Sequence, residues 1–457
     1  EENKNNIKIY LANNKGLFSY KNDILANINS FLRHTFDTRE SLENAIKQFQ
    51  NNITIIKKIF GPISLWDVSN VIDMSNLFFD SKTFNQPIND WDVYKVTNMS
   101  NLFRAAFEFN QPIGDWDVSN VTDMSYMFNM ASKFNQPIND WNVSNVKDMR
   151  LMFWNANNFN HPIGKWNVSN VTNMSSLVSQ CENFNQPIND WDVSNVTNMA
   201  RLFGFTKKYN QPLDKWNVSN VINMQKMFVR ATTFNHPIND WNVSNVTNME
   251  SMFHSAESFN QPIGNWNVSN VKNMEVMFSD AYVFNQPIND WNVSNVTNMN
   301  SMFHYAHNFN QPISKWNVSN VTSMGDMFSD TIFFNQPIGN WNVSNVKNMG
   351  GMFYNAITFN QPIGDWDVSN VRNMKNMFYR NINFNQPIGD WDVSNVTNMS
   401  GMFNGVKRFN QPINTKVVNE GQVNEYIAWN VSNVIDMSFL FQYSKFNQSI
   451  GNWDVSN

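Results

Sequence analysis

The chain has 457 residues, of which 15% are charged, and its formal net charge is −5. A nucleic-acid binder would carry a clustered surplus of basic residues, so this balance argues against nucleic acid as a partner. No apolar run reaches the roughly 18 residues of a membrane-spanning helix, and the polar N-terminus does not have the pattern of a signal peptide. The single cysteine, Cys181, cannot form a disulfide within the chain, and we expect it to be a small buried side chain.

Residues 1–64 lack the repeat that fills the rest of the chain, and we expect them to form a helical N-terminal cap. Asp23 to Thr35 and Glu40 to Gln50 have amphipathic patterns, and Ile53 to Phe60 is a candidate third helix. Solenoids need a capping element with a polar outer face, so this cap should pack on the first turn, at Trp66.

Tryptophan recurs every 25 residues from Trp66 to Trp391, and then at Trp429 and Trp453. A fixed period of this length is typical of a solenoid, in which each unit packs only on its neighbours. The sequence therefore predicts about 16 stacked turns, with a regular array over residues 65–413.

Each turn contains two different apolar patterns. Trp241 and Val243 alternate with polar residues, which is typical of a short strand. From Val246 to Phe259 the apolar positions step by 3, 3, 1, 3 and 3 residues, which favours a short helix that ends before Pro262. We therefore predict an α/β repeat solenoid with one short parallel strand and one short helix per turn. A parallel β-helix is the alternative.

An asparagine follows the last aromatic residue of every turn, which is phenylalanine except at Tyr209, from Asn85 to Asn410. Its amide can both donate and accept hydrogen bonds. We predict a ladder of these side chains that satisfies loop backbone groups between turns.

The period breaks near the end of the sequence. Residues 414–428 insert about 13 residues, either as a small excursion or as a short helix near Val423 to Ile427. The final turns, 429–457, stop inside a turn, which would leave an open strand edge. We expect that the natural chain continues, or that self-association or another assembly contact covers this edge.

The repeat resembles that of a known family. The pattern Trp-Asp-Val-Ser-Asn-Val-Thr-Asn-Met-Ser-x-Met-Phe, then Phe-Asn-Gln-Pro-Ile, as at Trp391 to Phe403 and Phe409 to Ile413, resembles the BspA-like surface-protein repeat, also called the bacterial surface protein 26-residue repeat. The resemblance covers residues 66–457. It implies a leucine-rich-repeat-like solenoid of the mycoplasma surface lipoprotein type, also found in large DNA viruses, with a role in adhesion. It implies no catalytic residues.

Positions that vary between turns are the candidates for partner binding, because repeat proteins recognise partners through such positions. Aromatic and arginine side chains are favoured interface anchors. The candidates of this kind are Arg104, Trp154, Phe205, Arg230, His254, His304, Tyr305, Tyr354 and Tyr379. They either shield neighbouring turns from water or form an exposed binding stripe.

Catalytic and metal sites are not predicted. His304 and His307 could share a metal ion, but no third ligand column accompanies them. Carboxylates at Asp280, Asp326 and Asp330 could serve glycoside hydrolysis only in a cleft. The insertion adds three further charged residues, namely Lys416, Glu420 and Glu425.

We therefore expect a non-catalytic solenoid without cofactors that mediates adhesion or protein–protein interaction at the cell surface or outside the cell. The alternative is a structural component of a larger assembly, associated with a virion or a filament. A polysaccharide-cleaving solenoid enzyme is a remote third possibility.

Overall fold

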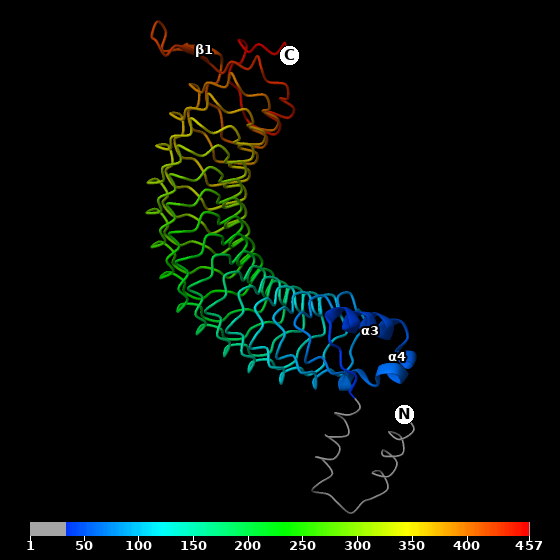
Figure 1. Ribbon diagram of the computed structural model, residues 1–457. Helices are drawn as coiled ribbons and strands as arrows, with labels where there is room; N and C mark the ends of the chain where they lie inside the picture. The colour runs from blue at the N-terminus through cyan, green and yellow to red at the C-terminus, as the bar shows by residue number, and fades with distance from the viewer. Residues whose placement is uncertain (1–32, 457) are drawn as a thin grey trace, which may run out of the picture.

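The computed structural model, described here for residues 33–456, is a curved solenoid of stacked turns (Figure 1). The turns follow one another along an arc, with two helices at the N-terminal end and a small hairpin at the other end. The predicted repeat solenoid is confirmed.

The N-terminal cap consists of α3 (Arg39–Asn51), α4 (Ile53–Phe60) and a 3-10 turn, η1 (Ile63–Leu65). Two of the predicted helices are thereby confirmed. Most of the remaining predicted helix, from Asp23 to Thr35, lies outside the described residues. Its last three residues are not helical, and Thr35 instead forms a parallel bridge with Asp67.

The cap packs on the first tryptophan of the array, as predicted. The Trp66 ring lies 5.0 Å from Phe36 and 6.0 Å from both Phe49 and Phe60, measured between ring centroids. Thr38 begins α3 by accepting a hydrogen bond from the Ser41 backbone N–H, which satisfies a donor that the helix itself leaves free.

The internal structure of the turn differs from the prediction. Within residues 66–413 the structure has neither an α-helix nor a continuous strand. Neighbouring turns meet instead through isolated parallel bridges in one column, for example from Asn248 to Asn273, five residues after the predicted strand at Trp241 to Val243. The helix-and-strand unit is therefore wrong, although the parallel stacking of turns is right.

A ladder of hydrogen bonds explains this backbone. In one turn, the N–H groups of Met249, Ser251, Phe253 and Ser255 donate to carbonyls of the next turn, over 2.8 to 3.1 Å. The intervening N–H groups bond within the turn, to the carbonyl three residues earlier or, at Glu250, to the Asn248 side chain. Every N–H in this segment is thus satisfied without helix or sheet.

These three-residue bonds also explain the misleading helical pattern. Met252 donates to Met249, Ala256 donates to Phe253 and Phe259 donates to Ala256, so three of the four apolar steps of three close a tight turn. Ser251 and Ser255 have φ of 54° and 55°, a left-handed conformation that is incompatible with continuation of an α-helix. We call residues 249–256 and their equivalents in other turns the inner segment.

The spacing between turns is smallest at the inner segment. Ring centroids in successive turns are 5.6 Å apart between Phe253 and Phe278, but 6.4 Å apart between Trp266 and Trp291. The turns therefore fan outward from the inner segment, which forms the concave edge of the arc in Figure 1.

Side chains connect the turns where the backbones are further apart. The indole N–H of Trp266 donates to the carbonyl of Ile238 in the preceding turn, over 3.0 Å. The side-chain amide of Asn245 reaches the carbonyl of Ser219 over 2.7 Å. The buried Trp, Val, Met and Phe columns form one continuous core between the inner segment and the opposite edge of the turns.

The predicted asparagine ladder is confirmed. The Asn260 side-chain oxygen accepts from the backbone N–H of Asn285, over 2.9 Å, and from the amide of Gln286. The backbone N–H of Asn260 in turn donates to Asn235 of the preceding turn. The column therefore bridges turns at a loop that the backbone ladder does not reach.

The cap also completes the ladder at its first turn. Every inner-segment bond between turns runs from an N–H to a carbonyl of the following turn, so the first turn presents carbonyls toward the cap. Arg39 in α3 donates to the carbonyl of Ser75 over 2.6 Å and lies 3.8 Å from the Asp73 carboxylate.

The insertion forms a β-hairpin rather than a helix. Strands β1 (Lys416–Val418) and β2 (Tyr426–Ala428) pair antiparallel, and they project from the array in Figure 1. The proposed helix near Val423 to Ile427 is wrong, because Tyr426 and Ile427 pair with β1 instead. The Tyr426 hydroxyl anchors the hairpin by donating to the carbonyl of Asp390.

Replacement of Asn260 by Leu should lower the free energy of unfolding by about 1–3 kcal/mol, because the Asn285 N–H and the Gln286 amide lose their acceptor. Thermal unfolding followed by circular dichroism measures the change. Asn265→Leu, at an exposed position of the same turn, is the control. Equal melting temperatures for the two variants would contradict the stabilising role of the ladder.

Tyr209 occupies a column that holds phenylalanine in neighbouring turns, at Phe184 and Phe234. Its hydroxyl is buried without a hydrogen-bond partner among the described residues. Tyr209→Phe should therefore stabilise the protein by about 1 kcal/mol, because an unsatisfied buried hydroxyl is removed. Tyr443→Phe, at an exposed tyrosine, should leave the melting temperature unchanged, and a destabilised Tyr209→Phe would show that the hydroxyl is paired.

Candidate binding stripe

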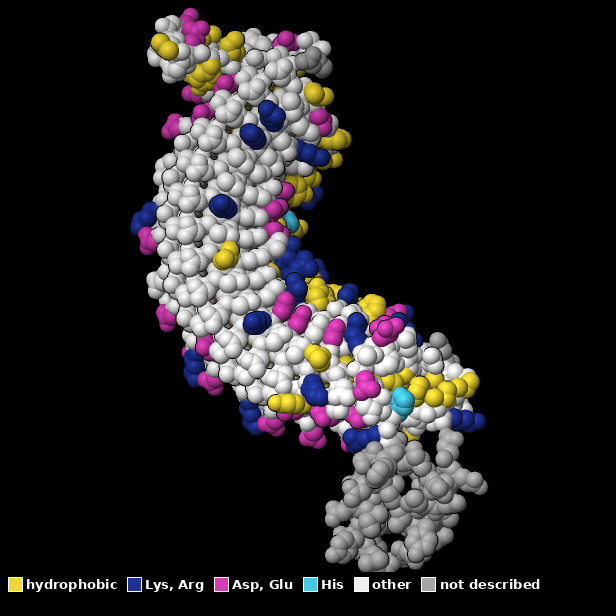
Figure 2. Space-filling model, in the orientation of Figure 1, with side chains coloured by type: hydrophobic (Ala, Val, Ile, Leu, Met, Phe, Trp, Pro, Cys, Tyr) yellow, Lys and Arg dark blue, Asp and Glu magenta, His cyan; other side chains and the backbone are white. Residues whose placement is uncertain are grey.

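The nine candidate residues occupy two adjacent columns of the inner segment. Six follow the inner phenylalanine directly, as His254 follows Phe253, and three lie one position later. None lies in the buried core: Arg230 and Tyr305 are exposed, and the other seven are half-buried. We call these two columns the inner stripe. Figure 2 shows charged, histidine and apolar side chains gathered along the concave edge.

The backbone fixes the direction of the second column. Phe205, Arg230 and Tyr305 have φ between 55° and 62°, which costs an L-residue roughly 1–2 kcal/mol. The ladder holds these residues in place, since each donates its N–H to the following turn. Their side chains therefore project from a rigid edge.

Arginines of the stripe lie over aromatic rings. The Arg104 guanidinium is 5.4 Å from the Phe79 ring and 5.1 Å from the Tyr126 ring. Arg230 lies 5.3 Å from the Phe205 ring. These contacts join neighbouring turns by cation–π attraction, and they orient the guanidinium groups.

A pair of tyrosines stacks further along the arc. Tyr354 and Tyr379 are parallel within 6°, with ring centroids 4.6 Å apart, and Arg380 lies 5.4 Å from the Tyr379 ring. Both rings are half-buried. They shield the turns beneath them and still present surface to a partner, so the two interpretations of these residues are compatible.

Histidines occupy the middle of the stripe. His254 lies 3.5 Å from the Asp280 carboxylate, while His304 packs edge-on against Tyr305 at 4.4 Å. Burial lowers the pKa of His254, and the backbone hydrogen bond to Ser279 and the nearby carboxylate of Asp280 only partly offset this. Trp154, nearer the N-terminus, is half-buried.

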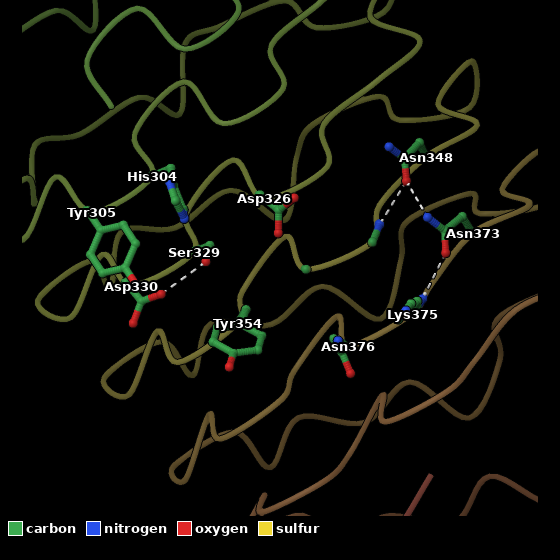
Figure 3. Close-up of a pocket in the computed structure, with 12 residues that line it drawn as sticks. His304, Tyr305, Asp326, Ser329, Asp330, Asn348, Tyr354, Asn373, Lys375 and Asn376 are labelled. Carbon is green, nitrogen blue, oxygen red and sulfur yellow. Dashed lines mark hydrogen bonds between the residues drawn. The ribbon is translucent and has the colours of Figure 1, made fainter. Parts of the chain in front are cut away.

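A hollow of about 430 Å³ opens in the stripe beside Tyr305 and Tyr354. Figure 3 shows His304 and these tyrosines on one side, with Asn348, Asn373 and Lys375 on the other. The hollow exists because Gly350 and Gly351 stand where other turns carry side chains, such as Glu250 and Ser251.

Two carboxylates line the hollow, and they differ in their hydrogen bonding. Asp330 is 8% exposed and accepts hydrogen bonds from the Ser329 hydroxyl and the Asn355 amide. Asp326 is exposed to the hollow and forms no hydrogen bond or ion pair through its carboxylate with any described residue. It lies over Gly351, where an added Cβ would overlap its Oδ1.

Burial and the neighbouring charges shift the pKa of two groups in the hollow, Asp326 and Tyr305. Desolvation by the surrounding turns raises the pKa of Asp326, and the negative charge of Asp330 adds to this, against an opposing effect of His304. The charge of Asp330 also raises the pKa of Tyr305. Lys375 also lines the hollow, so two carboxylates face one ammonium group there.

The structure gives other partners to the residues considered for chemistry. His307 stacks on Tyr282 at 5.3 Å rather than meeting His304 at a shared point. Over residues 33–456 no group of His, Cys, Asp or Glu side chains has metal-site geometry. In the hairpin, Lys416 pairs with Asp390, and Glu425 accepts from the backbone N–H of Gly421.

Sequence reasoning missed several residues of the stripe. Phe79 and Arg380 lie in the same two columns and could have been found from the period alone. Tyr126 and Gly351 belong to a third column, three residues before the first. Residues three and four apart share one face of a helix as well, so this column could also have been included from its spacing.

This fold and stripe define the class of the protein as a repeat solenoid with a continuous side-chain surface along its concave edge. The chain belongs to the family described as "Mycoplasma protein of unknown function, DUF285". The family model matches in seven overlapping segments, at residues 40–163, 136–240, 213–306, 232–338, 284–379, 331–427 and 357–457. A mycoplasma-type repeat is consistent with the predicted BspA-like resemblance.

A solved structure, "Crystal structure of TLR13-ssRNA13 complex", matches over 83% of this chain with 9% identity and a TM-score of 0.19. The match spans 62% of that chain. No curated protein matches the sequence. In the described part of the chain, no helix is long and apolar enough to cross a membrane.

Asp326→Asn should raise the melting temperature at pH 7, by on the order of 1 °C. The pKa of Asp326 is raised above its usual value of 3.8, so the folded chain holds this proton more tightly than the unfolded chain does. The ionised carboxylate therefore disfavours the fold at neutral pH, and this cost disappears as the pH falls through the raised pKa toward 3.8.

Melting curves of both proteins between pH 7 and pH 3 measure the effect. The advantage of Asp326→Asn should be present at pH 7 and should vanish at the acidic end. A variant that melts lower than the parent at pH 7 would show that the carboxylate has a stabilising partner.

Proposed function

We propose that the chain is a non-catalytic binding solenoid whose inner stripe engages a protein partner, as an adhesion or interaction module at a cell surface or outside the cell. The observation that supports this is the concentration of aromatic, arginine and histidine side chains on one rigid concave edge. Interfaces favour such residues because they present large contact areas at low entropic cost.

Rigidity supports the same function. Each side chain of the stripe is carried by a backbone whose N–H groups are bonded both within and between turns. A preorganised surface loses little conformational entropy on binding, so more of its contact energy appears as affinity. The outer faces carry mainly regular polar columns with isolated ion pairs, such as Lys165 with Asp140 and Lys215 with Asp190.

A non-catalytic role is part of this proposal. Asp330, which could serve as an acid or base, is held by Ser329 and Asn355. Two of the three charged residues of the insertion have partners: Lys416 pairs with Asp390, and Glu425 accepts from the backbone N–H of Gly421.

Replacement of both Tyr354 and Tyr379 by Ser should abolish partner binding while the protein stays folded. The stacked pair supplies exposed contact area, and serine cannot replace it. The immobilised protein is incubated with extract from the native host, and bound proteins are compared between parent and variant by quantitative mass spectrometry, with melting temperatures as a check on folding.

Tyr94→Ser is the matched control. Tyr94 is 54% exposed and lies outside the stripe, in a column that holds Ser119 in the next turn. A partner kept by the parent and by Tyr94→Ser, but lost by the double variant, supports the stripe. A partner kept by all three proteins would contradict it. Light scattering on the purified chain distinguishes the assembly alternative, which requires self-association.

A further inference from the structure

We propose that the hollow beside Tyr305 and Tyr354 is a pocket for one arginine side chain of the protein partner, with Asp326 as its counter-ion. This inference rests on the proposed binding function and names the chemistry of one contact within it.

Space is the first argument. The hollow has a volume of about 430 Å³, within the range of sites that hold a small ligand or a large side chain. Gly350 and Gly351 create it, and the adjoining turn keeps Gly325 in the same column as Gly350. In neighbouring turns this column holds Asn300 and Lys375, and Lys375 lines the hollow.

The second argument is the unpaired carboxylate. Other carboxylates of the inner segments have partners: Glu250 pairs with Lys226 at 2.8 Å, and Asp280 lies 3.5 Å from His254. Asp326 has none among the described residues, although it lies among polar groups that are already bonded to one another. Asn348, for example, accepts from the Gly350 N–H and from the Asn373 amide. A cation that enters the hollow would therefore find this acceptor free.

The walls favour a planar cation. Tyr305 and Tyr354 both line the hollow, and aromatic faces attract cations, guanidinium groups above all. The same stripe already uses this contact internally, because Arg104 lies over Tyr126 and Arg230 over Phe205. A guanidinium can bond a carboxylate with two N–H groups while its face lies against a ring, whereas an ammonium cannot do both.

Charge along the stripe supports a basic partner at this position. Five carboxylates occur on the inner segments of neighbouring turns, and they are Glu250, Glu275, Asp280, Asp326 and Asp330. The basic side chains Arg201, Lys226 and Arg230 precede this stretch, and Lys375 and Arg380 follow it. A cationic residue of a partner would therefore be directed to the middle of the arc.

Asp326→Asn tests the proposal directly, because this substitution should not unfold the protein. The probe is a capped heptapeptide with one arginine among glycines and serines. It is titrated into the parent protein and followed by calorimetry or by tyrosine fluorescence at low ionic strength. Two further peptides replace the arginine by citrulline, which has the same shape without the charge, and by lysine.

We expect the parent to bind the arginine peptide at least tenfold more tightly than the citrulline peptide, and more tightly than the lysine peptide. Asp326→Asn should weaken the arginine peptide at least tenfold. Asp240→Asn, which removes an exposed carboxylate outside the stripe, should bind like the parent. Equal binding of the arginine and citrulline peptides, or equal binding by Asp326→Asn and the parent, would overturn the proposal.

The outcome is separable from that of the proposed function. If the arginine peptide fails while the double tyrosine variant still loses its partner, the stripe binds a protein without this pocket. If the peptide binds through Asp326 while the double variant keeps its partner, the pocket stands and the stripe is not the protein-binding surface.

Discussion

The structure depends on one interaction, the hydrogen bond from an inner-segment N–H to the carbonyl of the next turn. Four such bonds recur at each step, all in the same sense, with tight three-residue bonds between them. They bring the turns closest together at the concave edge, so the wider-spaced aromatic columns must fan outward. The curvature of the arc therefore follows from where the backbone, rather than the side chains, connects the turns.

The same ladder separates structure from recognition. Because the backbone satisfies its own hydrogen bonds in the inner segment, the side chains that point outward there are not needed to complete the fold. The outer edge is different: Trp266, Asn245 and Asn260 connect turns through their side chains, so these columns hardly vary. Variation is concentrated where the backbone ladder connects the turns.

The sequence was sufficient to predict the solenoid, its parallel stacking, the two helices of the cap and the asparagine ladder. It was misleading about the turn itself. Apolar steps of three residues arise equally from an α-helix and from consecutive tight turns, and only backbone angles distinguish them. Ser251 and Ser255 adopt positive φ although serine gives no local signal for it, since the ladder imposes this conformation from outside the turn. The hairpin was likewise hidden, because the pairing of Tyr426 with Val418 depends on a partner strand.

The stripe was predicted in part. Its two main columns were recognised by their variability, but the third column, with Tyr126, Asp326 and Gly351, was left out although it lies only three residues before the first. A site in a periodic array must be made by local departure from the period, and here the departure is the removal of side chains at Gly350 and Gly351 beneath a charged residue. A solenoid is stabilised by contacts between neighbouring turns. The destabilisation caused by one strained or charged position is therefore confined to a turn or two, and the rest of the array stays folded. At this departure an unpaired carboxylate lies over Gly351, and the proposed arginine would supply its counter-ion.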